Sequence, residues 1–340
     1  MEKKIISVAI SDAYADRFGV QSSLQYNKNL TDAESGVAFM ISQLAYVEPK
    51  LYETPYADIV FDSLVPIDTS VPEWIDTVNY RSYDGATVGK FIGSAAKDLP
   101  SVALQAQIHT VQLGYAGLSC KYSLDELRKT SALNMPIDQT QMKLAYRGSR
   151  EHQQNIVLFG DSKRGMYGLL NHPNVTKTNS AVNWNTASAD EILNDVNSAL
   201  ADVWTDSNQR FMPNTLLLDT KRYVKLANTR LNDVTSQTIL EFIQQKNICT
   251  MQTGVKLDIR PLPQLLAANM NAAGVENKDR MVVYQKSPEN LVAYMPIAPR
   301  FIAPQYNGLE VVSPMEYKIS GTEFRYPTCA EYVTFNTAMS

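Results

Sequence analysis

Hydrophobic and polar positions alternate with the period of a strand through much of residues 56–122. Y-A-D-I-V-F at 56–61 is typical of a strand, and a long alternating run at 78–92 surrounds Asp84-Gly85, a dipeptide that favours a hairpin turn. A second run at 109–118 predicts the return strand. An isolated two-stranded ribbon cannot bury itself in water, so we expect this one to lie on the same subunit or on a neighbour.

The period changes to that of a helix after Pro136, which suits the first turn of a long helix from Ile137 to about Phe159. At 1.5 Å per residue this helix spans about 35 Å. Its centre, R-G-S-R-E-H-Q-Q-N, is polar nearly all round, which is typical of a helix that crosses a surface or bridges regions. Gly160 is well placed to end it, because glycine tolerates the left-handed conformation.

Three Ser/Thr-x-x-Glu capping boxes predict helix starts, at Thr31–Glu34, Ser123–Glu126 and Ser188–Glu191. Pro49 ends the first of these helices, and the third leads a clearly amphipathic helix. Residues 213–227 are typical of a buried strand, a turn capped by aspartate and a helix. A further helix is predicted at 237–246. Apolar runs predict later strands at 256–260, 281–285, 291–295, 309–312, 315–319, 323–326 and 331–335. The fold class is α+β, without βαβ repetition.

Composition narrows the function classes. The chain has 340 residues, of which 44% are hydrophobic, enough for a substantial core. It carries 31 basic and 35 acidic residues, a net charge of −4, which disfavours a globally basic nucleic-acid binder. No stretch approaches the roughly 18 apolar residues of a membrane span, and the N-terminal residues do not match a secretion signal. The cysteines, Cys120, Cys249 and Cys329, are widely spaced, which favours free thiols in a reducing cytoplasm.

The search for chemistry finds no catalytic, cofactor or metal site. Gly160 and Gly165 bracket a lysine and an arginine, but Met166 and Tyr167 stand where a phosphate-binding loop needs Lys and Ser or Thr. That loop also closes a helix, whereas a phosphate site should open one. The histidines, His109, His152 and His172, lack the spacing of a zinc site, and no serine lies in a G-x-S-x-G elbow.

Basic residues at 143, 147 and 150 share one face of the long helix. This face is either solvated or in contact with a polyanion or a neighbouring subunit, and the solvated interpretation is favoured. An arm at the N-terminus, a ribbon and a polar helix, none of them self-sufficient, together indicate a protein whose stability is completed by neighbours.

Three stretches carry a resemblance to a known family. They are L-A-Y-R-G-S-R-E-H-Q-Q-N-I-V-L-F-G-D-S-K-R-G-M-Y-G-L-L-N-H-P-N-V at 144–175, P-N-T-L-L-L-D-T-K-R-Y at 213–223 and R-Y-P-T-C-A-E-Y-V-T-F at 325–335. With the order of elements, they resemble the major capsid proteins of tailed phages, which have the Hong Kong 97-type fold. The resemblance implies five regions: an arm with a short helix (1–55), an extended hairpin loop (56–122), a peripheral domain with the spine helix and glycine loop (123–185), an axial domain (186–300) and closing strands (301–340).

The resemblance also implies which residues contact neighbouring subunits. On the ribbon these are Asp84, Gly85 and Lys90, and in the glycine loop they are Lys163, Arg164, Gly165, Met166 and Tyr167. We expect the basic pair of the loop to meet an acidic neighbouring subunit. Some members crosslink subunits through lysine and asparagine. Lys90 is a poor candidate for this, since no crosslinking triplet aligns.

The function implied is that of a virion structural protein, without enzyme activity or cofactor. It would self-assemble into pentamers and hexamers of an icosahedral shell around double-stranded DNA, contacting the DNA weakly. Portal, scaffolding and decoration proteins would be its partners, with a separate scaffold or none, because no long charged N-terminal extension is seen. It would assemble in the host cytoplasm. Two alternatives stay open: an encapsulin-like nanocompartment shell with protein cargo, and an enzyme whose site is assembled from scattered residues.

Overall fold

The computed structural model describes residues 58–84, 105–125, 137–231 and 237–339. Several predictions lie outside these residues: the arm at 1–55 with its capping box Thr31–Glu34, Glu126 of the second box, and Gly85 and Lys90 of the ribbon. The division at Ala57 separates that arm from the compact unit Asp58–Ser340, to which the following description applies.

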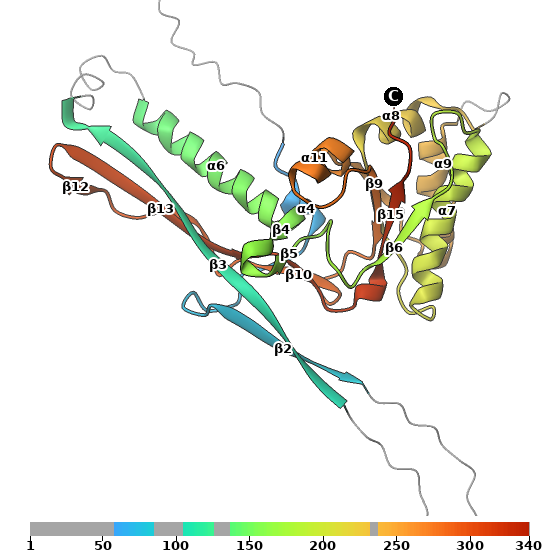
Figure 1. Ribbon diagram of the computed structural model, residues 1–340, viewed down its shortest axis with the longest axis horizontal. Coiled ribbons are helices and arrows are strands. Elements are labelled where there is room, and N and C mark those ends of the chain that lie inside the picture. The colour runs from blue at the N-terminus through green and yellow to red at the C-terminus, as the bar shows by residue number, and fades with distance from the viewer. Residues whose placement is uncertain (1–57, 85–104, 126–136, 232–236, 340) are drawn as a thin grey trace, which may run out of the picture. The chain divides into compact units, whose positions relative to one another are not determined.

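A mixed five-stranded sheet lies at the centre of the part of the chain formed by residues 176–290 and 325–339, which is called the axial region below (Figure 1). Its strands, in spatial order, are β6 (Thr176–Ser180), β15 (Ala330–Phe335), β9 (Arg280–Tyr284), β7 (Thr215–Leu218) and β8 (Asp258–Pro261). β15 runs parallel to β6 and antiparallel to β9, while β7 runs antiparallel to β9 and parallel to β8. The predicted strands at 213–218, 256–260, 281–285 and 331–335 are confirmed.

Both faces of this sheet are covered, so its central strands are apolar without alternation. Leu216 and Leu218 face one core cluster together with α7 (Ala189–Asp206), α8 (Thr220–Asn228), α9 (Ile239–Gln245) and α10 (Ile248–Thr253). Leu217 and Val282 face a second cluster with the end of the long helix α6, with η3 (Pro263–Leu265) and with α11 (Ala267–Ala272). The strand pattern alone therefore could not say which face met which helices.

Helices α7, α8 and α9 begin where the sequence predicts, whereas α10 and α11 have no counterpart among the predicted helices. Ser188 and Glu191 form both hydrogen bonds of a capping box at the start of α7. Asp219 caps α8 by accepting a hydrogen bond from the amide of Arg222, and Thr238 forms a capping box with Glu241 at α9. Each bond satisfies an amide that the first helical turn leaves without a partner.

A second five-stranded sheet carries the ribbon, and its longest strand is β3 (Gln105–Ser123). The inner half of β3, residues 113–123, pairs with β13 (Glu310–Ser320), and the outer half, 105–112, pairs with β2 (Thr77–Asp84). β11 (Ile297–Phe301) and β12 (Gln305–Asn307) both pair with the far edge of β13.

Two predicted strands, 309–312 and 315–319, are wrong in one respect, because β13 is a single strand that passes through Pro314. Proline lacks the amide hydrogen that a ladder needs, so it normally interrupts a central strand. Here Met315 pairs with Phe301 of β11 and Val312 with Gln305 of β12. Pro314 therefore lies in the interval where β13 changes partner, and its missing donor is tolerated.

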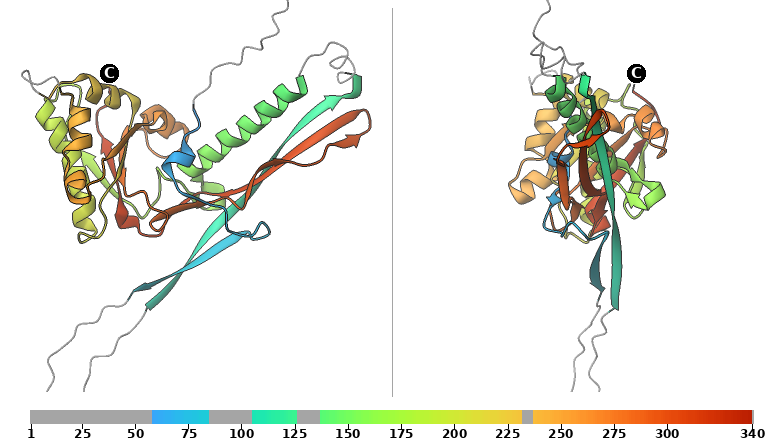
Figure 2. Two further views of the ribbon diagram at one scale, coloured as in Figure 1. Left: turned by 180° about the vertical axis from the view of Figure 1, so that it is seen from behind. Right: turned by 90° about the vertical axis from the view of Figure 1, so that its left-hand side faces the viewer.

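Helix α6 spans Ile137–Phe159, as predicted, and packs on β3 and β13 (Figures 1 and 2). Its polar centre is bonded into the subunit rather than left in water. The His152 Nδ1 lies 2.8 Å from the Tyr317 hydroxyl, and the Gln154 side-chain oxygen accepts a hydrogen bond from the amide of Val60. The last turn, Ile156 to Leu158, enters the core. The helix thus crosses a sheet and then anchors in the core.

A three-stranded sheet joins the two larger ones. It consists of β1 (Ile67–Asp68), β10 (Leu291–Tyr294) and β14 (Thr322–Phe324). The strand predicted at 56–61 is wrong over its described part, because residues 58–60 form no strand and the short helix α4 begins at Phe61 and ends at Leu64, while Tyr56 and Ala57 lie outside the described residues. Phe61, Leu64 and Val65 are all buried, and their i, i+3, i+4 spacing fits one helical face better than a strand.

Candidate inter-subunit surface

The glycine loop is a tight hairpin at the end of α6. β4 (Gly160–Asp161) pairs with β5 (Met166–Tyr167) around the single 3-10 turn η2 (Ser162–Arg164). Gly160 has φ +73° and Gly165 has φ +69°, the left-handed region that favours glycine. The prediction that Gly160 ends the helix is confirmed. Both glycines shape the backbone of the loop.

The charges of this loop are partly compensated within it. One carboxylate oxygen of Asp161 accepts a hydrogen bond from the amide of Lys163 at 3.0 Å. The Arg164 Nε lies 3.7 Å from the other carboxylate oxygen of Asp161. The Arg164 side chain is about half exposed. Lys163 is exposed and forms no ion pair with any residue that the structure describes. One uncompensated positive charge is therefore presented to solvent by a rigid turn.

Met166 and Tyr167 point in opposite directions. Met166 is buried in the core of its own subunit, so its side chain is not available at the surface, although we had expected it there. Tyr167 is 47% exposed and meets the His172 ring edge-on at 5.6 Å. Asn171 fixes the following turn, because its side chain accepts from the amide of Gly168 and donates to the carbonyl of Phe159. Of the five residues predicted in this loop, Lys163, Arg164, Gly165 and Tyr167 are therefore exposed and only Met166 is buried.

The ribbon leaves hydrophobic side chains uncovered. Asp84 is the last residue of β2 and pairs with Gln105, so it is a strand residue and not half of a two-residue turn. This corrects the predicted hairpin position, while Gly85 and Lys90 lie outside the described residues. Ile108 is 65% exposed and Tyr83 is 64% exposed, although Val111 and Leu113, further along β3, are buried. The outer ribbon therefore holds hydrophobic side chains that the described part of its own subunit does not cover.

The basic face of α6 is mostly used inside the subunit. Arg147 pairs with Glu151 at 3.0 Å. Arg150 pairs with Asp62 and lies over the Phe61 ring, 4.4 Å from its centroid. These contacts favour a structural role for Arg147 and Arg150, and they leave Lys143 exposed.

The titratable groups do not form a catalytic arrangement among the described residues. Burial lowers the pKa of His172 to about 4, so this ring is neutral near pH 7 and packs between Tyr167 and Phe324. All three cysteines are buried and free. Among the described residues no group of His, Cys, Asp and Glu could hold a metal ion, and no helix there is long and apolar enough to cross a membrane.

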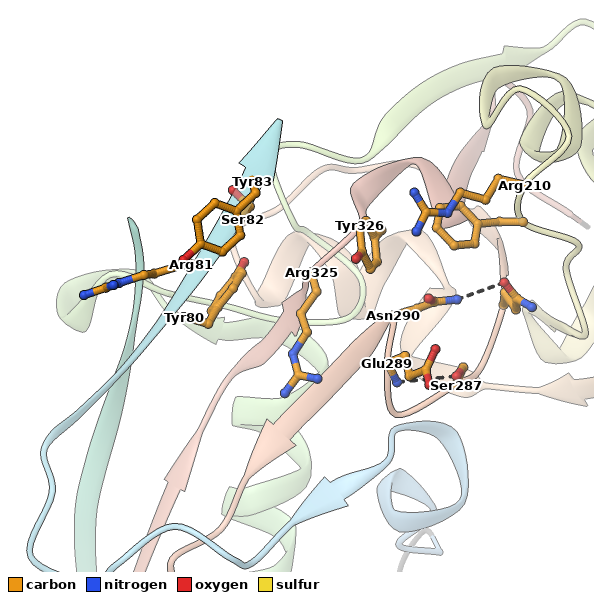
Figure 3. Close-up of a pocket in the computed structure, with 12 residues that line it drawn as sticks. Tyr80, Arg81, Ser82, Tyr83, Arg210, Ser287, Glu289, Asn290, Arg325 and Tyr326 are labelled. Atoms are coloured by element: carbon orange, nitrogen blue, oxygen red, sulfur yellow. Dashed lines mark hydrogen bonds between the residues drawn. The ribbon is translucent and has the colours of Figure 1, made fainter. Parts of the chain in front are cut away.

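Sequence reasoning missed a cleft of about 770 Å³ between the ribbon and the axial region (Figure 3). One wall is Tyr80 to Tyr83 of β2, and the other comes from Arg210 and Phe211, the 285–290 loop, Arg325 and Tyr326. The Arg210 guanidinium lies 4.9 Å from the Tyr326 ring centroid. These segments are far apart in sequence, so only the Arg-Phe and Arg-Tyr pairs at 210–211 and 325–326 could have signalled a shared surface.

Comparisons with known proteins identify the family. The family model for "Major capsid protein" matches residues 88–335, well over half of the chain. A search of curated proteins finds no sequence match. Among solved structures, the capsid of Myoviridae phage XM1 aligns with a TM-score of 0.73 at 10% identity, covering 86% of this chain and 97% of that one.

Two further structures agree. A structure from Mycobacterium phage Bobi aligns with a TM-score of 0.58 at 13% identity, covering 91% of this chain and all of that one. The capsid of a native GTA particle aligns with a TM-score of 0.61 at 9% identity, covering 90% and 100%. At such identities these likenesses establish the fold, which is the Hong Kong 97-type α/β fold of phage capsids. Together with the family match, they show that the chain belongs to the phage major capsid protein family, as a structural component of the virion capsid and not an enzyme.

Proposed function

We propose that this protein assembles into pentamers and hexamers that close an icosahedral shell around the double-stranded DNA of a tailed phage. The observation that carries the proposal is the outer ribbon. Ile108 and Tyr83 stand more than 60% exposed on a two-stranded segment that no other described part of the subunit covers. A two-stranded ribbon is marginal in water by itself, so a neighbouring subunit supplies the missing surface.

The glycine loop supports the same arrangement. It presents Lys163 and Arg164 on a turn fixed by Asp161, and the chain has a net charge of −4, so acidic surface is abundant on any neighbouring copy. Many such contacts, each weak, add up when symmetry repeats them around a ring and across a shell. Asp84, at the end of β2, lies on the ribbon, and Lys163, Arg164, Gly165 and Tyr167 are the contact residues of the loop.

The partners other than copies of the chain are also part of this proposal. Portal, scaffolding and decoration proteins act with the shell during assembly. The packaged DNA contacts the shell weakly and without sequence preference, because a mildly acidic protein releases few counterions from the phosphate backbone. Release of DNA from opened shells should therefore depend little on salt concentration.

The test is the oligomeric state of the purified protein, alone and with co-expressed portal and scaffolding proteins. We expect closed shells, or rings of five and six, in electron microscopy and light scattering. Ile108→Asp should block them, because it places a charge on the ribbon, while leaving the unfolding of free subunits unchanged. A protein that stays monomeric even with these partners would contradict the proposal.

A further inference from the structure

A rigid loop between β1 and β2 holds one tryptophan in solvent. Trp74 is 81% exposed, the highest value among the large hydrophobic residues of the described chain. Its neighbours on both sides, Val71 and Ile75, pack against the small core beneath the ribbon. The amide of Ile75 bonds to the carbonyl of Pro72 at 3.3 Å, which closes the turn around Trp74.

Ion pairs fix this loop on the sheet below. Arg300 of β11 donates two hydrogen bonds to the Glu73 carboxylate, at 2.8 and 2.7 Å, and a third to Glu316. Lys318, itself buried, lies 2.7 Å from Asp76. A bidentate guanidinium–carboxylate pair fixes direction as well as distance. The loop is therefore pre-organised, and little conformational entropy remains to be lost when Trp74 is covered.

The surroundings of Trp74 are more acidic than basic. The acidic residues there are Glu73, Asp76 and Glu316, and the basic residues are Arg300 and Lys318. The Asp76 side chain is 86% exposed in spite of its ion pair. An excess of carboxylates beside an exposed ring disfavours nucleic acid as the occupant. It favours a cationic and aromatic surface, because an indole ring attracts guanidinium groups over its face.

The cleft beside β2 is such a surface (Figure 3). It contains Arg210 and Arg325 against the single carboxylate Glu289, and neither arginine forms an ion pair with a described residue, while the Arg81 side chain of the same wall points away from them. Arg210 lies over the Phe211 ring at 5.2 Å, and Arg325 donates to the Tyr294 hydroxyl and the Pro288 carbonyl. A volume of about 770 Å³ is ample for one indole with its flanking residues.

The backbone before Arg210 ends helix α7 with two residues of positive φ. Asn208 and Gln209 have φ of +51° and +63°, a region that costs non-glycine residues free energy. Their amides bond to the last turn of α7, at the carbonyls of Thr205 and Trp204. This turn projects Arg210 outward beside Tyr326 at the mouth of the cleft (Figure 3).

We propose that the Trp74 loop of one subunit seats in the arginine–tyrosine cleft of a second copy of this chain. The Trp74 loop and the arginine–tyrosine cleft are different surfaces of the subunit, so the contact between them is heterologous. Repeated around a closed circle of subunits, such a contact generates a ring. In the isolated subunit Trp74 is exposed, so it does not occupy its own cleft. Tryptophan and arginine at the centre of such a contact supply most of its binding energy. This inference rests on the proposed self-assembly and adds the pair of surfaces that one ring contact uses.

Tryptophan fluorescence tests the contact directly. The chain has three tryptophans, of which Trp184 is buried and Trp204 is half-buried. A Trp204→Phe background leaves Trp74 as the accessible ring and Trp184 as an internal reference. Acrylamide should quench Trp74 in free subunits. In nuclease-treated shells the part of the fluorescence that acrylamide quenches should be lost. The Arg210→Glu variant should either form shells in which Trp74 is again quenched or form no shells. The unfolding of its free subunits should be unchanged. Lys177→Glu, at an exposed cation of β6 outside the cleft, should change neither result.

Each other result has a separate meaning. Shells in which Trp74 stays quenchable would overturn the contact and leave the proposed function intact. Protection that survives both Arg210→Glu and Tyr326→Ala would place Trp74 on some other surface and also overturn it. Protection seen only in shells that retain DNA would identify nucleic acid as the occupant, against the inference. If the natural protein forms neither shells nor rings even with co-expressed portal and scaffolding proteins, that result would instead refute the proposed function itself.

Discussion

The two five-stranded sheets of this protein differ in how far one subunit completes them. In the axial sheet every residue of β7, β9 and β15 is buried, with a core cluster on each face. In the ribbon sheet the inner part of β3 is covered by α6 and β13, but its first four residues, 105–108, are exposed. The axial sheet therefore stabilises the subunit, and the ribbon is a surface that assembly completes.

The difference also explains where functional residues were hard to find. A residue that acts only against a neighbour has no partner in its own subunit, so neither a motif nor a local contact marks it. In the proposed assembly Ile108 and Trp74 share this property, since each is exposed and neither was named from the sequence, whereas Lys163 was named only through the family resemblance.

The largest effect that separates the sheets should come from Leu217→Ala in β7. Leu217 is fully buried, so its truncation leaves a cavity and should lower the free energy of unfolding of free subunits by about 2–5 kcal/mol. Ile108→Ala, at a residue 65% exposed, should stay within about 0.5 kcal/mol. Urea unfolding followed by circular dichroism measures both. An equal loss from the two variants would mean that the ribbon is already a packed part of the subunit.

A second comparison concerns two glycines in the same hairpin. Gly160 and Gly165 have nearly the same positive φ. A Cβ added at Gly160 would lie 2.2 Å from the Met166 carbonyl oxygen, whereas a Cβ added at Gly165 would have no atom within 4 Å. Gly165→Ala should cost only the left-handed conformation, about 1–2 kcal/mol. Gly160→Ala adds about 1–3 kcal/mol for the overlap. Thermal unfolding of the two variants gives the difference. Equal melting temperatures would show that the loop shifts freely and is not a rigid contact surface.

Much of the framework could be predicted from the sequence because it depends on local signals. The ends of α6, the caps at Ser188 and Asp219, and the late strands follow from periodicity, capping residues and glycine. The exceptions had tertiary causes: Pro314 was taken to divide a strand, because its tolerance depends on the change from β11 to β12. The cleft and the Trp74 loop were missed for the same reason, since ion pairs such as Arg300–Glu73 join residues 227 positions apart.

A third effect belongs to the axial sheet alone and depends on pH. Glu331 of β15 is buried, and this burial, with Asp202 and Asp206 of α7 nearby, raises its pKa from the ordinary 4.5 to about 7, although Thr178 donates a hydrogen bond to it. Its folded-state pKa lies above the unfolded value. Its contribution is therefore fully present below about pH 4.5 and is lost as the pH rises to 7.

Glu331→Gln removes that titration. We expect the variant to gain stability relative to the natural protein as the pH rises from 5 to 8, by about 1–3 kcal/mol in the free energy of unfolding, since one pKa unit corresponds to about 1.4 kcal/mol. Urea unfolding at both pH values measures it. A difference between the two proteins that is independent of pH would show that the Glu331 carboxyl titrates normally.

The smallest effect on folding should accompany a large effect on assembly. Reversing both charges of the glycine loop, Lys163→Glu with Arg164→Glu, removes one surface ion pair at 3.7 Å, so the free energy of unfolding of free subunits should fall by less than about 1 kcal/mol. If the loop meets an acidic neighbour, the yield of shells should fall sharply, and more so at low ionic strength, where screening is weak. The matched control, Lys177→Glu with Lys221→Glu, changes two exposed cations of the axial region by the same total charge. Light scattering over a salt series separates the cases. Equal yields from both double variants would exclude the loop as an electrostatic contact and leave the ribbon as the surface on which the subunits join.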